Sequence, residues 1–99
     1  MNKMVTVATA KAGKTIEAIA ALKALVDYGR TKYGYKGEAY LQILGGTLGT
    51  IYTIAEFDDA ASYQALVAKV MKDEGYLALA RKAAELTTSP PTLAFLQPV

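Results

Sequence analysis

Hydrophobic and polar residues alternate along several segments of this chain, and in two longer segments the hydrophobic residues recur every three to four positions. Alternation is typical of β-strands, because successive side chains of a strand point to opposite faces of its sheet. Gly45 and Gly46 separate two of the alternating segments and permit the positive φ angles that a tight hairpin needs. The pattern therefore predicts strands over residues 3–10, 38–44, 48–57 and 92–96.

The longer period predicts two helical regions. The first follows Gly13-Lys14 and should end near Gly29. The second begins near Asp58, breaks near Glu74-Gly75 and continues to residue 84, before the prolines at 90 and 91. Asp is a preferred residue for capping a helix N-terminus, so Asp58-Asp59 should cap this second region.

The predicted element order is β-α-β-β-α-β, which gives an α+β fold with a four-stranded antiparallel sheet and the helices on one face. Prolines flank the last strand, which suggests an edge position in the sheet. No linker or repeat interrupts the pattern, so residues 1–99 are expected to form a single domain. Both faces of the predicted hairpin are largely apolar, which predicts that the helix-free face packs against a second copy in a homodimer.

Composition adds to this picture. The chain has 99 residues, of which 53% are hydrophobic, yet no apolar run approaches the roughly 18 residues that a membrane span needs. It has no cysteine and no signal-like hydrophobic segment after residues 1–3, so we expect a cytoplasmic protein outside the membrane. The net charge is only +2 and the cations are dispersed, which argues against a nucleic-acid partner.

Tyrosines and cations provide the candidate ligand site, since phenol rings and cations can hold an aromatic or anionic molecule. One group lies around the end of the first helix, and further tyrosines lie on the hairpin strands and the second helix. The same tyrosines could instead cover the open end of the core or fill a dimer interface. Tyr63 and Tyr76 lie on apolar helix faces and are expected in the core or a cavity wall, with Met71 filling space in the core. The candidate ligand residues are Tyr28, Arg30, Tyr33, Tyr35, Lys36, Tyr40, Tyr52 and Tyr63.

Two local motifs have a structural explanation. Residues 8–15 fit a relaxed phosphate-binding pattern with Lys14 and Thr15 in the usual places, but the first glycine is replaced by Ala8. A turn between strand and helix explains them more simply. Glu56, Asp58 and Asp59 are too few for a metal site and fit a helix cap, so neither a metal nor a cofactor is predicted.

Several segments resemble the dimeric α/β-barrel superfamily, in particular its NIPSNAP and antibiotic-biosynthesis-monooxygenase-like branches. They are residues 11–17 after the first strand, the glycine-rich hairpin, and the segments 55–59 and 72–76. The resemblance spans nearly the whole chain and implies homodimers of ferredoxin-like protomers. Members range from cofactor-independent oxygenases and haem-degrading enzymes to proteins without an assigned reaction. This chain has no histidine or tryptophan, and its only asparagine is Asn2, so no catalytic residue is assigned.

Three functions remain open on the sequence alone. The first is binding of a small apolar or aromatic molecule in a pocket rimmed by tyrosines. The second is a cofactor-independent monooxygenase acting on phenolic or polyketide-like substrates, with Tyr40, Tyr52 or Lys36 assisting deprotonation. The third is RNA binding by base stacking on the sheet, which is disfavoured because residues 3–10 contain no aromatic side chain.

Overall fold

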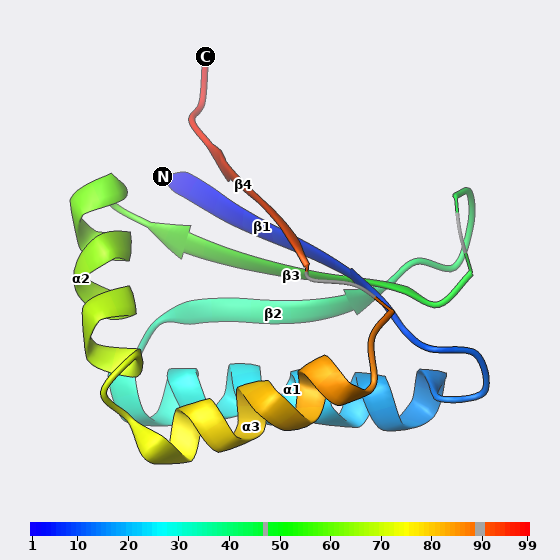
Figure 1. Ribbon diagram of the computed structural model, residues 1–99. Coiled ribbons are helices and arrows are strands. Elements are labelled where there is room, and N and C mark those ends of the chain that lie inside the picture. Colours follow the sequence, from blue (N-terminus) through cyan, green and yellow to red (C-terminus); the bar gives the residue numbers. More distant parts are fainter. Residues whose placement is uncertain (47, 89–90) are drawn as a thin grey trace.

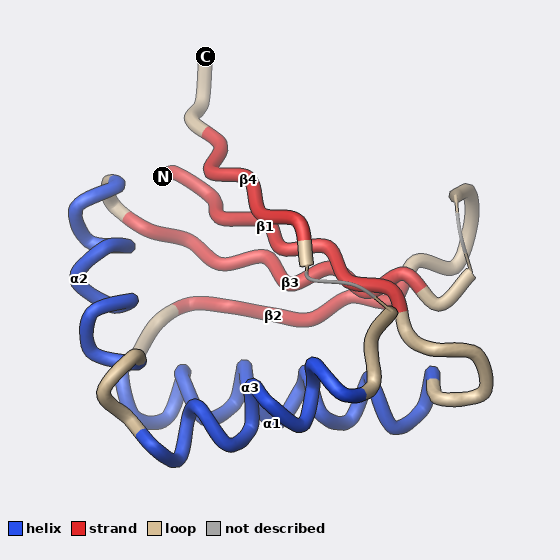
Figure 2. Tube along the Cα trace, viewed as in Figure 1, coloured by secondary structure: helices blue, strands red, loops and turns tan. Residues whose placement is uncertain are grey.

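The computed structural model describes residues 1–46, 48–88 and 91–99 (Figures 1 and 2). Within these residues the chain forms one four-stranded antiparallel sheet and three helices, which confirms the predicted α+β architecture. In chain order the elements are β1 (Asn2–Thr9), α1 (Thr15–Tyr33), β2 (Lys36–Leu41), β3 (Thr50–Phe57), α2 (Ala60–Val70), α3 (Glu74–Glu85) and β4 (Thr92–Leu96).

The strands lie in the order β2-β3-β1-β4, so β4 is at an edge of the sheet, as its flanking prolines predicted. Neighbouring strands pair Tyr40 with Tyr52, and Tyr52 with Val7, in one row across the sheet. Met4 and Phe95 pair in another row, on the opposite face. Partners in an antiparallel pair share a face, so these rows define the two sides of the sheet.

Helices α1 and α3 lie side by side along one face of the sheet, and α2 stands across its end (Figure 1). Alternate residues of the central strands face these helices, and Ala8, Ile51 and Ala55 among them are buried. The intervening residues, such as Val5 and Ile54, point to the face that α1 and α3 leave uncovered. The helices therefore cover one face, as the sequence predicted.

Helix α1 runs past Gly29 to Tyr33, so the predicted end at Gly29 is wrong. The helix ends at Gly34, which adopts the left-handed conformation with φ of 69° and donates its N–H to Arg30 O. Gly29 serves a packing purpose instead. A Cβ at Gly29 would lie 2.1 Å from Cε1 of Tyr35, so only glycine leaves room for that ring.

The second helical region consists of two helices, as predicted. Asp59 caps α2 by accepting a hydrogen bond from Ser62 N at 2.8 Å. The chain turns at residues 71–73 and α3 starts at Glu74, so the break lies just before the glycine that was expected to cause it. The prediction of a core position for Met71 is wrong, because its side chain is 63% exposed at this turn.

The connection between β2 and β3 is longer than predicted. Strand β2 ends at Leu41 and β3 begins at Thr50. Residues 42–44 and 48–49, which were predicted to be strand, therefore belong to the loop. Gly45 and Gly46 have positive φ angles, as expected. Thr47, the third residue of the predicted turn, lies outside the described residues. Large apolar side chains of this loop extend into solvent: Ile43, Leu44 and Leu48.

A cavity between the helices and the sheet

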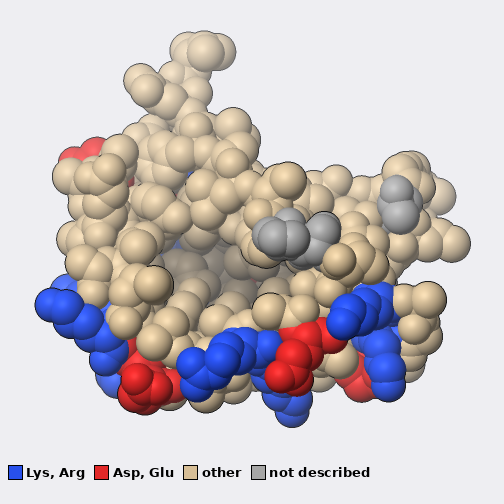
Figure 3. All heavy atoms as spheres, in the orientation of Figure 1, with Lys and Arg blue, Asp and Glu red and all other residues tan. Residues whose placement is uncertain are grey.

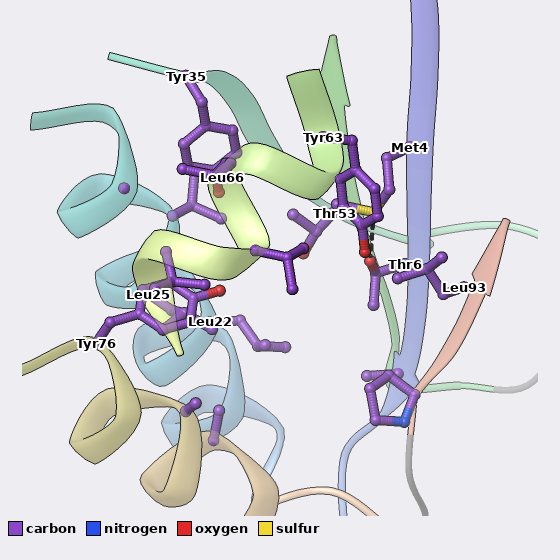
Figure 4. A pocket seen from close by; sticks show the side chains of 18 of the residues that line it. Met4, Thr6, Leu22, Leu25, Tyr35, Thr53, Tyr63, Leu66, Tyr76 and Leu93 are labelled. Carbon is purple, nitrogen blue, oxygen red and sulfur yellow. Dashed lines mark hydrogen bonds between the residues drawn. The ribbon is translucent and has the colours of Figure 1, made fainter. Parts of the chain in front are cut away.

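Helices α1, α2 and α3 and the helix-facing side of the sheet enclose a cavity of about 300 Å³. It opens as a hollow in the face of the molecule shown in Figure 3, and Figure 4 shows its interior. None of the described residues that line it is charged. Its walls include Met4, Thr6, Ala8, Leu22, Leu25, Val26, Tyr33, Tyr35, Thr53, Phe57, Tyr63, Leu66, Val67, Val70, Tyr76, Ala80, Ala83, Ala84, Thr87, Pro91 and Leu93.

Small residues on α3 leave space for this cavity. Ala80, Ala83 and Ala84 form the wall that α3 contributes, at the spacing of one helix face. The C-terminal end of α3 is tied to the sheet, where Lys11 N donates to Leu86 O at 2.9 Å and Thr88 N donates to Thr9 O at 2.9 Å. Beyond Tyr76 in its first turn, α3 thus contributes only small side chains to the cavity wall.

The N-terminal end of α3 is held by Asp73, whose side chain is only 6% exposed. Its carboxylate caps α3 by accepting hydrogen bonds from Gly75 N at 3.0 Å and Tyr76 N at 3.2 Å. These two hydrogen bonds compensate for the burial of the Asp73 carboxylate and stabilise the first turn of α3.

The same carboxylate binds α1. It accepts from the hydroxyl of Tyr28 at 2.8 Å and of Tyr33 at 2.5 Å, and pairs with Lys32 Nζ at 2.8 Å. The hydrogen bonds from Lys32 and then Tyr33 hold the pKa of Asp73 well below its usual range. The hydrogen bond to Asp73 raises the pKa of Lys32. Both groups therefore stay charged at neutral pH, and the positive charge of Lys32 is balanced by the carboxylate of Asp73.

Aromatic rings close one end of the cavity. The rings of Tyr35 and Phe57 stack with centroids 6.3 Å apart, and Tyr63 meets Phe57 edge-on at 5.3 Å. Phe95 of β4 lies 5.7 Å from Tyr63. These rings come from distant parts of the chain and offer both ring faces and ring edges to an aromatic ligand.

The hydroxyl groups of the cavity fall into two sets. In the first set the hydrogen is already donated: Tyr33 donates to Asp73, and Thr87 to Ala83 O at 3.3 Å. Thr6 lies 3.0 Å from the sulfur of Met4.

The second set comprises the hydroxyl of Thr53 and the phenols of Tyr35, Tyr63 and Tyr76, which form no hydrogen bond with any described residue. Burial raises the pKa of Tyr35 to about 12, with a smaller contribution from nearby Tyr76. Burial also raises the pKa of Tyr76. Both groups are therefore neutral phenols at physiological pH.

The structure brings three of the predicted ligand residues to the cavity: Tyr33, Tyr35 and Tyr63. They reach it from the end of α1, the loop before β2 and the first turn of α2. Residues 71–73, where the helical region breaks, are what allow α2 to stand across the sheet and place Tyr63 there (Figure 1).

The other predicted residues lie elsewhere. Tyr28 is beside the cavity in the hydrogen-bond network of Asp73. Arg30, Lys36 and Tyr40 line a separate groove at the edge of the sheet. Tyr40 and Tyr52 are on the uncovered face, so the sheet separates them from the cavity. The predicted proton-transfer roles of Tyr40, Tyr52 and Lys36 therefore do not fit a substrate bound in the cavity.

Tyr76 and the alanines of α3 were not among the predicted ligand residues. Tyr76 was expected in the core or a cavity wall, and it lines the cavity together with Ala80 and Ala84. The i, i+4, i+8 spacing of these residues was a usable signal, because it places them on one helix face. Thr6 and Thr53 had no such signal, since a threonine in a strand is common on either face.

The two local motifs have structural roles. Lys14 caps α1 without a side-chain hydrogen bond, and its Nζ lies 3.8 Å from Glu17, an ion pair on the surface. The cluster around Asp59 caps α2, as expected. Among the described residues, no three acidic, histidine or cysteine side chains are grouped to hold a metal. No helix in the described part of the chain is long and apolar enough to span a bilayer.

No family model and no curated protein matches this sequence, but solved structures match its fold. An uncharacterized NIPSNAP domain protein from Burkholderia xenovorans has a TM-score of 0.84 at 19% identity, with 100% of this chain and 95% of that chain covered. An antibiotic biosynthesis monooxygenase has a TM-score of 0.76 at 15% identity, with 100% and 99% covered. A dimeric protein of unknown function from Bacteroides fragilis has a TM-score of 0.73 at 16% identity, with 97% and 94% covered.

The TM-scores establish a shared fold. Sequence identities this low do not extend to a shared activity. The agreement extends over the full length of the chain. The resemblance predicted from the sequence is therefore confirmed, and the chain has the ferredoxin-like fold of the NIPSNAP domain and antibiotic-biosynthesis-monooxygenase-like proteins.

Proposed function

We propose that this protein binds a small, uncharged apolar or aromatic molecule in the cavity between its helices and its sheet. The observation that supports this most strongly is a cavity of about 300 Å³ whose described walls carry no charged side chain. Ligand pockets are typically concave, mainly apolar and at least about this large.

The aromatic end of the cavity favours a planar ring system. Tyr35, Phe57 and Tyr63 present a stacked pair and an edge-on contact within one cluster. A bound ring can join such a cluster in offset or edge-on geometry, which adds about 0.5–1.5 kcal/mol to the burial of its surface.

A naphthalene derivative tests this proposal. We expect 2-isopropenylnaphthalene to bind with a Kd on the order of 100 µM, measured by isothermal titration calorimetry. Ala80→Leu should weaken binding at least about tenfold, because the larger side chain occupies the cavity. Ala78→Leu is the matched control, since Ala78 lies on the exposed side of the same helix. Equal binding by both variants, or no binding by the wild type, would contradict the proposal.

Homodimer formation through the uncovered sheet face is the second part of the proposal. This face carries Val5, Val7, Tyr52 and Ile54 at its centre, and neighbouring proteins of this fold include a dimeric one. Lys3, Glu56 and Lys36 form a row of charges across three strands at one end of this face. Glu38 lies in the next row, paired with Ile54 on the edge strand β2. A second copy placed on this face would cover the apolar rows and leave the charged end at the rim.

Light scattering coupled to size exclusion tests the dimer. At about 50 µM the wild type should have twice the chain mass, and Ile54→Arg should shift the population to monomers, because it buries a charge at the interface. Lys36→Glu, a charge change in the charged row at the end of the same face, is the control and should remain dimeric. A wild type that is monomeric at this concentration would refute the interface.

Oxygenase chemistry is a second candidate, because one similar structure is an antibiotic biosynthesis monooxygenase. It would require a group in the cavity that accepts a substrate proton. The carboxylate of Asp73, which accepts a hydrogen bond from the cavity residue Tyr33, is also held by Lys32 and has a lowered pKa, so it is a weak base. Binding without turnover therefore fits the described residues better.

A further inference from the structure

Three phenol hydroxyls of the cavity, those of Tyr35, Tyr63 and Tyr76, bond to no described residue, and Tyr35 and Tyr76 are the two whose burial raises the phenol pKa. The side chains of Tyr35 and Tyr76 reach the cavity from the loop before β2 and from the first turn of α3 (Figure 4). Every fully buried side-chain nitrogen or oxygen among the described residues has a partner, so these unpartnered hydroxyl oxygens keep some accessible surface, and their side chains line the cavity. Their neighbours Tyr33 and Thr87 have already donated theirs.

We infer that the cavity selects an uncharged, mainly hydrocarbon molecule that carries a hydrogen-bond acceptor oxygen, such as a ketone, ester or ether, and that Tyr35 and Tyr76 donate to this oxygen. The inference rests on the proposed function and adds to it the polarity of the ligand. It assigns these two tyrosines the role of residues that determine specificity.

The ionisation behaviour of the phenols supports this assignment. Burial raises the pKa of both groups, so each retains its proton at neutral pH and acts as a donor. The ring of Tyr35 packs closely against Gly29 and Gly37, which leave no room for a Cβ, and this packing restricts its movement. A fixed donor costs little conformational entropy on binding, which makes its hydrogen bond more selective.

An anionic ligand does not fit the same walls. The described lining residues offer no cation, and the ammonium of Lys32, next to the lining residue Tyr33 in the chain, already pairs with Asp73 at 2.8 Å. Transfer of a carboxylate from water into an apolar space without a paired charge is strongly unfavourable. Two hydroxyl donors can satisfy one acceptor oxygen, but they do not compensate for a buried full charge.

Three compounds of matched shape test the inference: 2-acetylnaphthalene, 2-isopropenylnaphthalene and 2-naphthoate. The first two differ only in C=O against C=CH2. Without a donor in the cavity the ketone would bind more weakly, because its carbonyl would lose hydrogen bonds to water. With donors present we expect the ketone to bind about 3- to 10-fold more tightly than the alkene in the wild type. At pH 7 the carboxylate should bind at least about 100-fold more weakly than the ketone.

Phenylalanine variants show whether the two tyrosines are responsible. Tyr76→Phe and Tyr35→Phe should each reduce the preference for the ketone, and the double variant should reverse it. Affinity for the alkene should change less than about twofold in all of them, which also reports that the cavity remains folded. Tyr40→Phe removes a phenol from the opposite face of the sheet and should leave the preference unchanged.

The outcomes separate the two proposals. If the alkene binds at least as tightly as the ketone in the wild type, the inference fails and the proposed function stands. If the ketone preference survives in the double variant, the assignment to Tyr35 and Tyr76 is wrong. If 2-naphthoate binds as tightly as the ketone, the exclusion of anions is wrong. If none of the neutral compounds binds, both the inference and the proposed function fail.

Discussion

At the residue scale, the ring of Tyr35 determines how α1 meets the sheet. Its Cε1 would lie 2.1 Å from a Cβ at Gly29, and its Cε2 would lie 2.6 Å from a Cβ at Gly37. The ring is therefore held between a helix and a strand, and it forms the base of the aromatic end of the cavity. A glycine inside a helix normally lowers stability, so Gly29 is tolerated here because it makes this packing possible.

Gly29→Ala tests this packing. Alanine usually stabilises a helix interior by about 0.5–1 kcal/mol relative to glycine. Here we expect the free energy of unfolding to fall by about 1–3 kcal/mol, because the ring cannot move away from the new methyl group. In a Tyr35→Ala background the same change should become stabilising. Urea denaturation measures both effects, and a stabilising Gly29→Ala in the otherwise wild-type chain would contradict the account.

At the element scale, the position of α3 depends on contacts between parts of the chain that are far apart in sequence. Asp73 joins the start of α3 to Tyr28 and Tyr33 of α1, and the backbone of Leu86 joins its end to the strand-helix loop. These two attachments hold α3 over the cavity.

Asp73→Ala and Asp59→Ala form a matched pair, because both residues cap a helix. Asp59 bonds only within its own turn, to Ser62, whereas Asp73 also binds α1. We expect the decrease in melting temperature caused by Asp73→Ala to be at least about twice the decrease caused by Asp59→Ala. Similar losses in the two variants would show that the bonds to α1 contribute nothing.

The dependence on pH follows from the same network. The folded state lowers the pKa of Asp73, chiefly through Lys32, so its contribution to stability is present above the ordinary carboxyl pKa of about 4 and is lost as pH falls below it. The difference in melting temperature between the wild type and Asp73→Ala should therefore shrink as the pH falls from 5 towards 2.

The local sequence was sufficient to predict most helices and strands. It was not sufficient to predict where they end or which residues line the cavity. Alternation and capping residues identify the strands and the start of α2 at Asp59, because these signals act within a few residues. The end of α1 was misplaced because the role of Gly29 depends on a ring that packs from outside the helix. Tyr40 and Tyr52 were grouped with the ligand residues because composition alone does not assign a face of the sheet.

At the scale of the whole molecule, the two faces of the sheet have different partners. The helix-facing side borders an uncharged cavity, and the opposite side presents apolar rows that end in a row of charges. In our account a small molecule occupies the cavity on the helix-facing side, and another copy of the chain covers the opposite face. The three-dimensional arrangement therefore separates two apolar surfaces that the sequence pattern could not distinguish.

Methyl NMR spectra recorded during a titration with 2-isopropenylnaphthalene test the central claim most directly, because they locate the bound molecule. The account predicts that the methyl signals of Leu22 and Leu66, which line the cavity, shift with the added compound. The signals of Val5 and Val7, on the uncovered face, should stay in place. Shifts at Val5 and Val7 with none at Leu22 and Leu66, or no shifts at all, would contradict the account.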